Sequence, residues 1–306
     1  MDQQTLCTYI DHYLSNCQYQ KGLNAKTIKA YRIDLQQFSV FMKVYDCNKE
    51  SIQSYIASLY PKYKFKSIKR KIASLKAFFS YLEFEELISA NPFNKIQIKL
   101  HEPFLLPRTI PFTTIGRILQ CAYQQKQLLE HSTYQFHAVL RDVAVLELLF
   151  ATGIRVSELC SLRPSDIDLQ VGTVRIYGKG AKERIVQIGN AEVLSAVTAY
   201  YQAFASQITQ SDCFFVNRLG TQLSDQSVRF MIRKYAALAG VEQHITPHMF
   251  RHSFATLLLE EDVDIRYIQQ LLGHSSITTT QIYTHVTSKK QRDILTAKHP
   301  RNKIYI

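Results

Sequence analysis

The sequence lacks the features that mark membrane, secreted or zinc-binding proteins. No stretch of its 306 residues approaches the roughly 18 to 20 uninterrupted apolar residues that a membrane-spanning helix needs. The N-terminus, MDQQTLCTYIDHYL, has neither the basic start nor the apolar run of a secretory signal. The six cysteines are scattered without a CxxC pair, which argues against a zinc site or a disulfide framework. We therefore expect a cytoplasmic protein with reduced thiols.

Clustered carboxylates are lacking too, although a metal-dependent nuclease would need them to bind its cations. Asp166 and Asp168 are close together in PSDIDL, but they precede a predicted hairpin and have no third carboxylate nearby. We interpret them as turn or buried polar residues. We expect no metal site and no cofactor.

Positive charge is what the sequence has in excess. The formal net charge is +12, and such a surface favours polyanionic partners because each phosphate contact releases counterions. Ribosomal, membrane-surface and merely basic housekeeping proteins share this property. Charge alone therefore makes nucleic acid a candidate partner without deciding the function.

The first hundred residues have the apolar spacing of helices, followed by a segment rich in proline. We expect helices at about 4–18, 25–44, 50–59 and 66–87, the second of them beginning after an N-cap at Asn24. From about 88 to 112 the helical period is absent and four prolines interrupt the chain, which indicates an extended linker. We therefore expect a helical domain with its linker over residues 1–105 and a second domain over 106–306.

The second domain is predicted to be mainly helical with a small antiparallel β-sheet. Helices are expected at about 113–126 and 138–151, with a C-terminal cap at Gly153. The polar excursion at 124–137 between them has no role that we can assign. The stretch DLQVGTVRIYGKGAKERIVQIG alternates apolar and polar residues around a glycine-rich turn, as a β-hairpin does. Helices follow from about residue 191.

Six polar residues stand out against this helical background, and each one alone is a weak signal. They are Arg155, Lys179, His248, Arg251, His274 and Tyr283. Together they offer two guanidiniums, two imidazoles, an ammonium and a phenol. Arginine forks suit the non-bridging oxygens of a phosphodiester, a phenol can act as its nucleophile, and a lysine or histidine can protonate the leaving oxygen. The set therefore suits phosphodiester cleavage without a metal.

The stretches that carry these residues resemble those of the tyrosine recombinases, also called the phage-integrase family. They are ATGIRVSEL, GKGAKER, TPHMFRHSFAT and LGHSSITTTQIYTHV, and they are most similar to the simple Xer-like members. The six positions occur in the family's order at compatible separations. The resemblance covers essentially the whole chain, and it implies an N-terminal SAM-like helical bundle that binds DNA and a catalytic domain.

The resemblance implies how the scissile phosphate is bound. Arg155 and Arg251 bind it and stabilise its transition-state charge, and His274 donates a hydrogen bond to it. Glu158 matches an acidic position that supports the first arginine. His252, which follows the second arginine in the sequence, is expected to serve packing instead.

The resemblance also implies the covalent chemistry. Tyr283 attacks the phosphate to give a 3′-phosphotyrosyl link, Lys179 protonates the departing 5′-oxygen, and His248 is the acid/base partner of the tyrosine. The phosphotyrosine conserves the bond energy, so religation to another strand needs neither ATP nor a metal.

Two basic segments are candidate DNA contacts. One is the run at the start of the helix expected at 66–87 and the other is SDQSVRFMIRKY, with the candidates Lys64, Lys66, Lys69, Arg70, Lys71, Arg229 and Arg233. A helix start favours phosphate binding. A charge run can equally be a solvated surface.

The resemblance implies a clamp around duplex DNA and a tetramer on two DNA sites, formed by this protein alone or together with a partner recombinase. Residues 287–306 are expected to dock onto a neighbouring protomer or to fold back on their own domain. The chain begins directly with the helical domain, which favours a simple system without an arm-site domain. A topoisomerase of the same chemistry and a catalytically silent DNA-binding relative are the alternatives. The sequence does not decide between chromosome-dimer resolution, plasmid resolution and integration of a mobile element.

Overall fold

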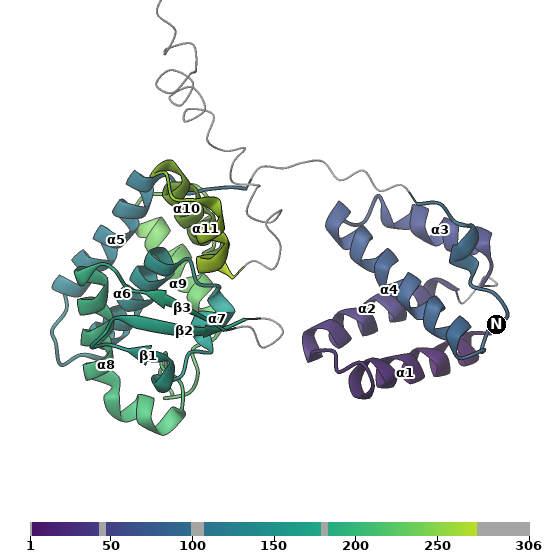
Figure 1. Ribbon diagram of the computed structural model, residues 1–306, viewed down its shortest axis with the longest axis horizontal. Helices are drawn as coiled ribbons and strands as arrows, with labels where there is room; N and C mark the ends of the chain where they lie inside the picture. The colour runs from purple at the N-terminus through teal and green to yellow at the C-terminus, as the bar shows by residue number, and fades with distance from the viewer. Residues whose placement is uncertain (1, 43–46, 99–106, 179–182, 274–306) are drawn as a thin grey trace, which may run out of the picture. The chain divides into compact units, whose positions relative to one another are not determined.

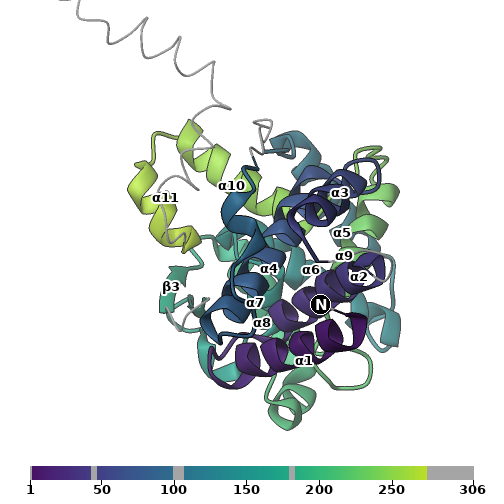
Figure 2. The same cartoon turned by 90° about the vertical axis from the view of Figure 1, so that its right-hand side faces the viewer.

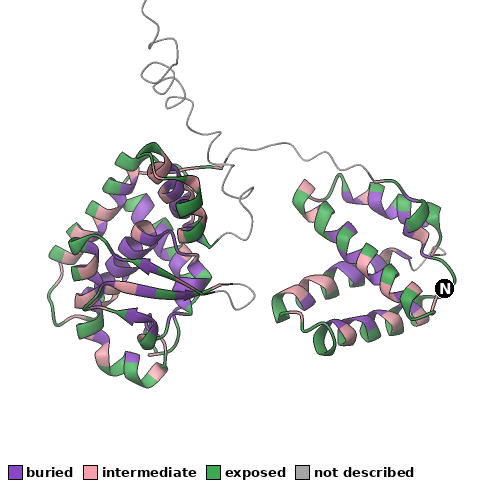
Figure 3. Ribbon diagram, viewed as in Figure 1, coloured by how far each residue is buried: buried purple, intermediate pink, exposed green. Residues whose placement is uncertain are grey.

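The chain forms two compact units, Met1–Phe104 and Leu105–Ile306, each with its own hydrophobic core. The computed structural model describes residues 2–42, 47–98, 107–178 and 183–273 (Figure 1). The boundary expected near residue 105 falls among residues 99–106, outside the described part. Within each unit the buried residues lie on the faces where the helices meet (Figure 3).

The N-terminal unit is a helical bundle. Its elements are α1 (Gln3–Tyr19), α2 (Ala25–Phe41), α3 (Lys49–Leu59), α4 (Phe65–Phe84) and the short 3₁₀ helix η2 (Pro92–Lys95). The first three helices begin at an Asp or Asn whose side chain accepts a hydrogen bond from a backbone N–H of the first turn. Asn24 does so from the Thr27 N–H at 2.9 Å, so the predicted N-cap is confirmed.

The linker was expected to begin at about residue 88, and that expectation is wrong for residues up to 96. Pro92 opens the helix η2, where its missing N–H costs nothing. Phe93 and Ile96 are each only 7% exposed and belong to the core of the N-terminal unit. Proline therefore marks a helix start here and not an extended chain.

The second unit surrounds a small sheet with helices. Its helices are α5 (Phe112–Gln127), α6 (Tyr134–Thr152), α7 (Val156–Cys160), α8 (Ala191–Ser211), α9 (Asp225–Leu238), α10 (Pro247–Glu260) and α11 (Ile265–Leu272), with a 3₁₀ helix η3 (Pro164–Asp166). The strands β1 (Ile167–Asp168), β2 (Thr173–Tyr177) and β3 (Glu183–Gln187) pair antiparallel in the order β1-β2-β3. The mainly helical architecture with a small antiparallel sheet is as predicted.

The polar excursion predicted at 124–137 is shorter than expected. Helix α5 continues to Gln127 and α6 begins at Tyr134, so only residues 128–133 lie between helices. Thr133 caps α6 by accepting a hydrogen bond from the Phe136 N–H at 3.1 Å. A local cap thus allows the helix to start within a polar stretch.

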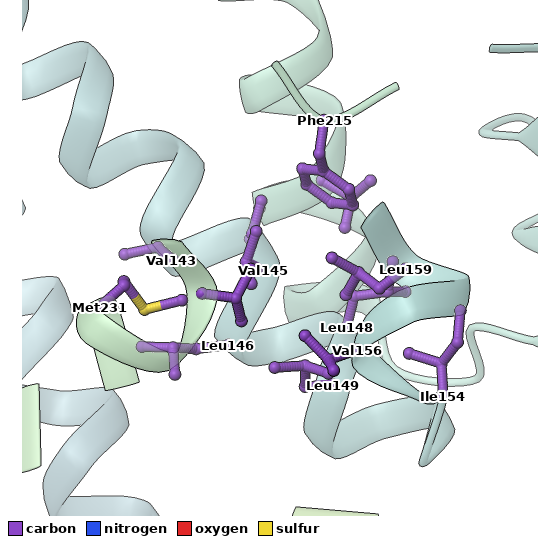
Figure 4. Packing of buried hydrophobic residues seen from close by; sticks show 14 of the residues in the cluster. Val143, Val145, Leu146, Leu148, Leu149, Ile154, Val156, Leu159, Phe215 and Met231 are labelled. Carbon is purple, nitrogen blue, oxygen red and sulfur yellow. The ribbon is translucent and has the colours of Figure 1, made fainter. Parts of the chain in front are cut away.

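Helix α6 is the central helix of this unit, and its burial fixes the turn that follows it. Val145, Leu146, Leu148 and Leu149 are fully buried. Figure 4 shows Leu148 and Leu149 beside side chains of α7. Burying a side chain of this size contributes about 1.5–3 kcal/mol. This packing against α7 therefore fixes the position of the C-terminal end of α6.

Helices α10 and α11 lie side by side, and α11 lies next to β3 (Figure 2). Ala255 of α10 packs with Ile268 and Leu272 of α11 in a small cluster of its own. This cluster places the C-terminal end of α11 near the end of α6.

None of the helices in the described ranges is long and apolar enough to cross a membrane.

Candidate functional site

The turn between α6 and α7 places Arg155. Gly153 adopts the left-handed conformation with φ 58° and ψ 22°, and its N–H donates to the Leu149 carbonyl. A Cβ at this position would lie 2.5 Å from Cδ1 of Phe254, so glycine is required by conformation and by space. Arg155 follows as the N-cap residue of α7. The predicted C-terminal cap at Gly153 is confirmed.

Glu158 holds both the main chain and the side chain of Arg155. Its Oε2 accepts a hydrogen bond from the Arg155 N–H at 3.0 Å, and its Oε1 accepts one from Nη1 at 2.6 Å. Burial raises the pKa of Glu158, but the hydrogen bond and charge of Arg184 and the hydrogen bonds of Arg155 outweigh burial and leave the pKa below its usual value. The carboxylate is therefore ionised and fixes an arginine whose side chain remains 33% exposed.

Arg251 is buried on α10, with 4% of its surface exposed. Its Nη1 donates to the carbonyl oxygen of Gly153 at 2.7 Å, and its Nη2 donates to that of Leu272 at 2.5 Å. These two carbonyls belong to the segment before Arg155 and to the end of α11. The guanidinium thus joins two chain segments that are far apart in the sequence.

Consecutive carbonyls at the end of α11 accept hydrogen bonds from three arginines. Leu271 accepts from Nε of Arg184 at 2.9 Å, and Leu272 accepts from Arg251 as described above. Gly273 accepts a long hydrogen bond of 3.5 Å from Nη2 of Arg155. The last carbonyls of a helix have no partner within it and carry partial negative charge, so this end of α11 attracts the cations.

His248 lies on α10, one turn before Arg251, with its side chain exposed. Partial desolvation lowers the pKa of His248, and the positive charges of Arg251, Arg229 and Arg155 lower it further. The imidazole is therefore neutral at neutral pH and can accept a proton. His252 is partly buried, and burial together with His248 and Arg251 lowers its pKa to about 4.

Three of the six predicted catalytic residues lie outside the described residues. Lys179 follows the end of β2, and His274 directly follows Gly273 in the sequence. Tyr283 comes nine residues after His274. The structure brings together Arg155, Arg251 and Glu158 of the predicted set.

Sequence reasoning missed Arg184. Because Arg184 pairs with Ile176 and Val186 pairs with Val174 in the β2–β3 register, Arg184 and Val186 share one face of β3. That face is directed toward the core, and only 11% of the Arg184 side chain is exposed. A signal was present, since Arg184 is in phase with the apolar Val186 and Ile188 two and four residues later.

The predicted basic run divides into an exposed part and a buried residue. Lys64, Lys66, Lys69 and Arg70 are exposed at the start of α4. Arg70 also forms an ion pair of 2.5 Å with Asp34 of α2. These four remain candidates for DNA contacts.

For Lys71 the predicted DNA contact is wrong. Its side chain is 2% exposed, and its Nζ lies 3.0 Å from Oδ1 of the buried Asp34. It also donates to Gln37 and lies over the ring of Tyr63. The physical reason is its position, because residue 71 shares a helical face with Ile68, Ile72 and Leu75. Its ammonium compensates a buried carboxylate and is not available to phosphate.

The remaining predicted residues have simpler surroundings. On α9, Arg229 lies 3.7 Å from Asp225, and the exposed Arg233 lies over the ring of Phe230. Asp166 is buried and accepts from the Arg163 N–H, and Asp168 accepts from two backbone N–H groups of the following turn. Their interpretation as buried polar and turn residues is confirmed. In the described ranges no three His, Cys, Asp or Glu side chains form a possible metal site.

Comparisons with known proteins define the class of fold. The model of the phage integrase family matches residues 122–290, and that of the N-terminal SAM-like domain of phage integrases matches residues 10–86. A solved structure of the XerH site-specific recombinase, bound to a palindromic difH substrate in a post-cleavage complex, has the same fold. It superposes with a TM-score of 0.75 at 22% identity, covering 92% of this chain and 82% of that one.

Relatives then establish the family. A tyrosine recombinase of Agathobacter rectalis is 55% identical over 299 residues, which are 97% of each chain. The tyrosine recombinase XerC of Thermodesulfovibrio yellowstonii is 38% identical over 304 residues, covering 96% of this chain and 97% of that one. The chain belongs to the phage-integrase family of tyrosine recombinases, the enzymes that cleave and rejoin DNA strands.

Proposed function

We propose that the protein is a site-specific DNA recombinase that exchanges strands through a 3′-phosphotyrosyl intermediate on Tyr283. The observation that carries this proposal is the placement of two arginines on one scaffold. Arg155 is fixed by Glu158, and Arg251 is fixed by the carbonyls of Gly153 and Leu272. Two guanidiniums held beside one turn suit the two non-bridging oxygens of a phosphodiester.

In the cleavage step the phenolic oxygen of Tyr283 attacks phosphorus, and the bond from phosphorus to the 5′-oxygen breaks. The phenolic proton passes to His248, whose lowered pKa keeps its imidazole neutral at neutral pH. Lys179 supplies a proton to the departing 5′-oxygen, and His274 donates a hydrogen bond to the phosphate. The charge that builds on the non-bridging oxygens is stabilised by Arg155 and Arg251.

In the rejoining step a free 5′-hydroxyl attacks the phosphotyrosine and releases Tyr283. One phosphodiester is exchanged for another of similar energy, so the step needs no ATP and no metal. Rejoining to a strand from another recombination site is recombination. We place the reaction in the cytoplasm, where bacterial replicons reside.

The partner is duplex DNA carrying specific recombination sites. The net charge of +12 and the exposed Lys64, Lys66, Lys69 and Arg70 of α4 favour phosphate contacts. Arg229 and Arg233 of α9 are further candidates. A palindromic site, as in the XerH complex, binds two copies related by its two-fold axis, so two such sites assemble a homotetramer. Exchange of the C-terminal segment between protomers would link them.

A suicide-substrate assay tests this proposal. Nicked duplex fragments that cover the source replicon are incubated with the protein in EDTA, and protein–DNA adducts are resolved on a denaturing gel. Tyr283→Phe is the control. We expect an adduct that requires Tyr283 and forms on one fragment only, which would also locate the site.

Two other outcomes would overturn the proposal. Adducts on every fragment would indicate a topoisomerase that cleaves without a specific site. A DNA-binding relative without catalysis would give a different pair of results. The wild-type protein would bind DNA tightly without forming an adduct, and the Tyr283→Phe variant would still perform the biological role. The fragment that reacts would also distinguish resolution of a replicon from integration of a mobile element.

A further inference from the structure

Arg184 is an arginine on the inward face of a short strand, a place where a charge needs compensation. It pairs in register with Ile176, which is 1% exposed. Only 11% of the Arg184 side chain is exposed. The groups that accept hydrogen bonds from Arg184 compensate its charge, and they are also the groups that Arg184 holds in place.

The first of these contacts is a parallel pair of hydrogen bonds to Glu158. Nη2 of Arg184 donates to Oε2 at 2.7 Å, and Nη1 donates to Oε1 at 3.2 Å. The same two oxygens accept the N–H and the Nη1 of Arg155. Each oxygen of Glu158 therefore serves both arginines, and the orientation of the carboxylate toward Arg155 is set by the fork of Arg184.

The second contact is to the end of α11. Nε of Arg184 donates to the carbonyl of Leu271 at 2.9 Å. A Cβ at Gly273 would lie 3.0 Å from Nη1 and 3.1 Å from Cδ of Arg184, so the guanidinium lies directly against the main chain there. The next residue in the sequence is His274, for which we propose a phosphate contact.

We infer that Arg184 is a positioning residue for strand cleavage, an inference that rests on the proposed function. One planar side chain fixes Arg155 through Glu158 and fixes the end of α11, from which the chain continues to His274. Lysine cannot replace it, because an ammonium lacks the three coplanar donors that reach Glu158 and Leu271 together. Arg184 is also the largest of the influences that lower the pKa of Glu158, so it keeps the carboxylate ionised for Arg155.

The test compares cleavage with binding. Arg184→Lys and Arg184→Gln are assayed beside Arg175→Gln, the matched control, which changes an exposed arginine on the neighbouring strand β2. Adduct formation in a single turnover is measured on the nicked duplex fragment that reacts with the wild-type protein. Affinity for the uncleaved fragment and thermal unfolding are measured on the same proteins.

We expect both Arg184 variants to cleave roughly 100-fold more slowly, as a small misplacement of a phosphate-binding group does. We expect their DNA affinity to stay within about threefold of wild type, because the other phosphate contacts are unchanged. The Arg175 control behaves as wild type. In a Glu158→Gln background the Arg184→Gln change has a much smaller effect on cleavage, because part of what it positions is already lost.

The inference is overturned if the Arg184 variants cleave at the wild-type rate. It is equally overturned if cleavage and DNA affinity fall together with thermal stability, or if the effects at 184 and 158 simply multiply. These results leave the proposed function intact, since the wild-type protein still forms its adduct through Tyr283. A wild-type protein that forms no such adduct overturns the proposed function and this inference with it.

Discussion

Nη1 of Arg251 lies 2.7 Å from the carbonyl oxygen of Gly153, and this contact joins α10 to the turn that carries Arg155. Arg251 is buried, and both of its Nη atoms donate to main-chain oxygens. The two arginines that we assign to the phosphate are thus linked through the backbone of a single turn. Changes on either side of this contact should affect both stability and cleavage.

Replacing Arg251 with lysine keeps the charge and removes the planar fork. We expect the free energy of unfolding to fall by about 1.5–3 kcal/mol and single-turnover cleavage to fall roughly 100-fold. Urea denaturation and the suicide-substrate assay measure the two effects. Arg266→Lys, at an exposed position of α11, is the control and should change neither. Normal cleavage by the Arg251 variant would refute its assigned role.

Gly153→Ala tests the turn itself. The positive φ and the approach to Phe254 should together lower the free energy of unfolding by about 1–3 kcal/mol. Gly116 lies exposed in α5, and a Cβ there would meet no heavy atom within 4 Å, so Gly116→Ala should instead raise the free energy of unfolding by about 0.5–1 kcal/mol. Chemical denaturation of both variants provides the comparison. Equal effects of the two substitutions would contradict the requirement for glycine at 153.

His252 should make the folded state sensitive to acid. Its pKa is lowered to about 4 in the folded protein, whereas an unfolded histidine titrates near 6.5. Between these values the unfolded state binds more protons, so stability is full above about pH 6.5 and is lost as the pH falls toward 4. Urea denaturation at several pH values should show this decline, and His252→Gln should reduce it. The same decline in the variant would exclude His252 as a cause.

His248 should determine the acidic limb of the cleavage rate. In the proposed mechanism the neutral imidazole accepts the proton of Tyr283, so the rate is full above the pKa of His248 and falls as the pH drops through it. Because that pKa is lowered from 6.5, the decline should be centred below pH 6.5. Single-turnover rates from pH 5 to 8 provide the measurement, with His244→Gln, in the exposed loop before α10, as the control. If the cleavage rate of His248→Gln falls at acidic pH as that of the wild-type protein does, His248 is not the proton acceptor.

Substitutions of the exposed Lys66 and the buried Lys71 should have different effects. Lys66→Ala should reduce the slope of log affinity against log salt by about 0.9 on duplex DNA, because one phosphate contact is lost. Lys71→Met should leave this slope unchanged and lower the free energy of unfolding by about 3 kcal/mol, because the compensation of Asp34 is weakened. Salt-dependent binding isotherms and urea denaturation measure the two effects. If Lys71→Met altered the slope of log affinity against log salt, Lys71 would again be a candidate DNA contact.

Helices and their ends were predictable because they follow local rules. Apolar spacing indicated α1, α2 and α6, and the caps at Asn24 and Gly153 were recognised from residue type and position. The hairpin followed from alternation. These features depend on neighbours within a few residues, which the sequence displays directly.

Contacts between distant segments were not predictable in the same way. The ion pair of Lys71 with Asp34 spans two helices, and nothing within the basic run itself showed that Lys71 faces the core. The fork of Arg184 on Glu158 joins a strand to a helix 26 residues away. Residue 93 joined the core of the first unit because a proline began a short helix. In each case tertiary burial decided the outcome.

The three arginines at the end of α11 are bound by main-chain oxygens, and a main-chain oxygen is present whatever the side chain. Substitutions at Leu271 can therefore leave the acceptors of the site in place, provided that Ile268 and Leu272 keep the helix seated in its apolar cluster. Gly273 is the exception, since Arg184 occupies the space beside it. The exposed face of α11, which includes Tyr267, can thus change in sequence without disturbing the arginines that we propose for phosphate binding.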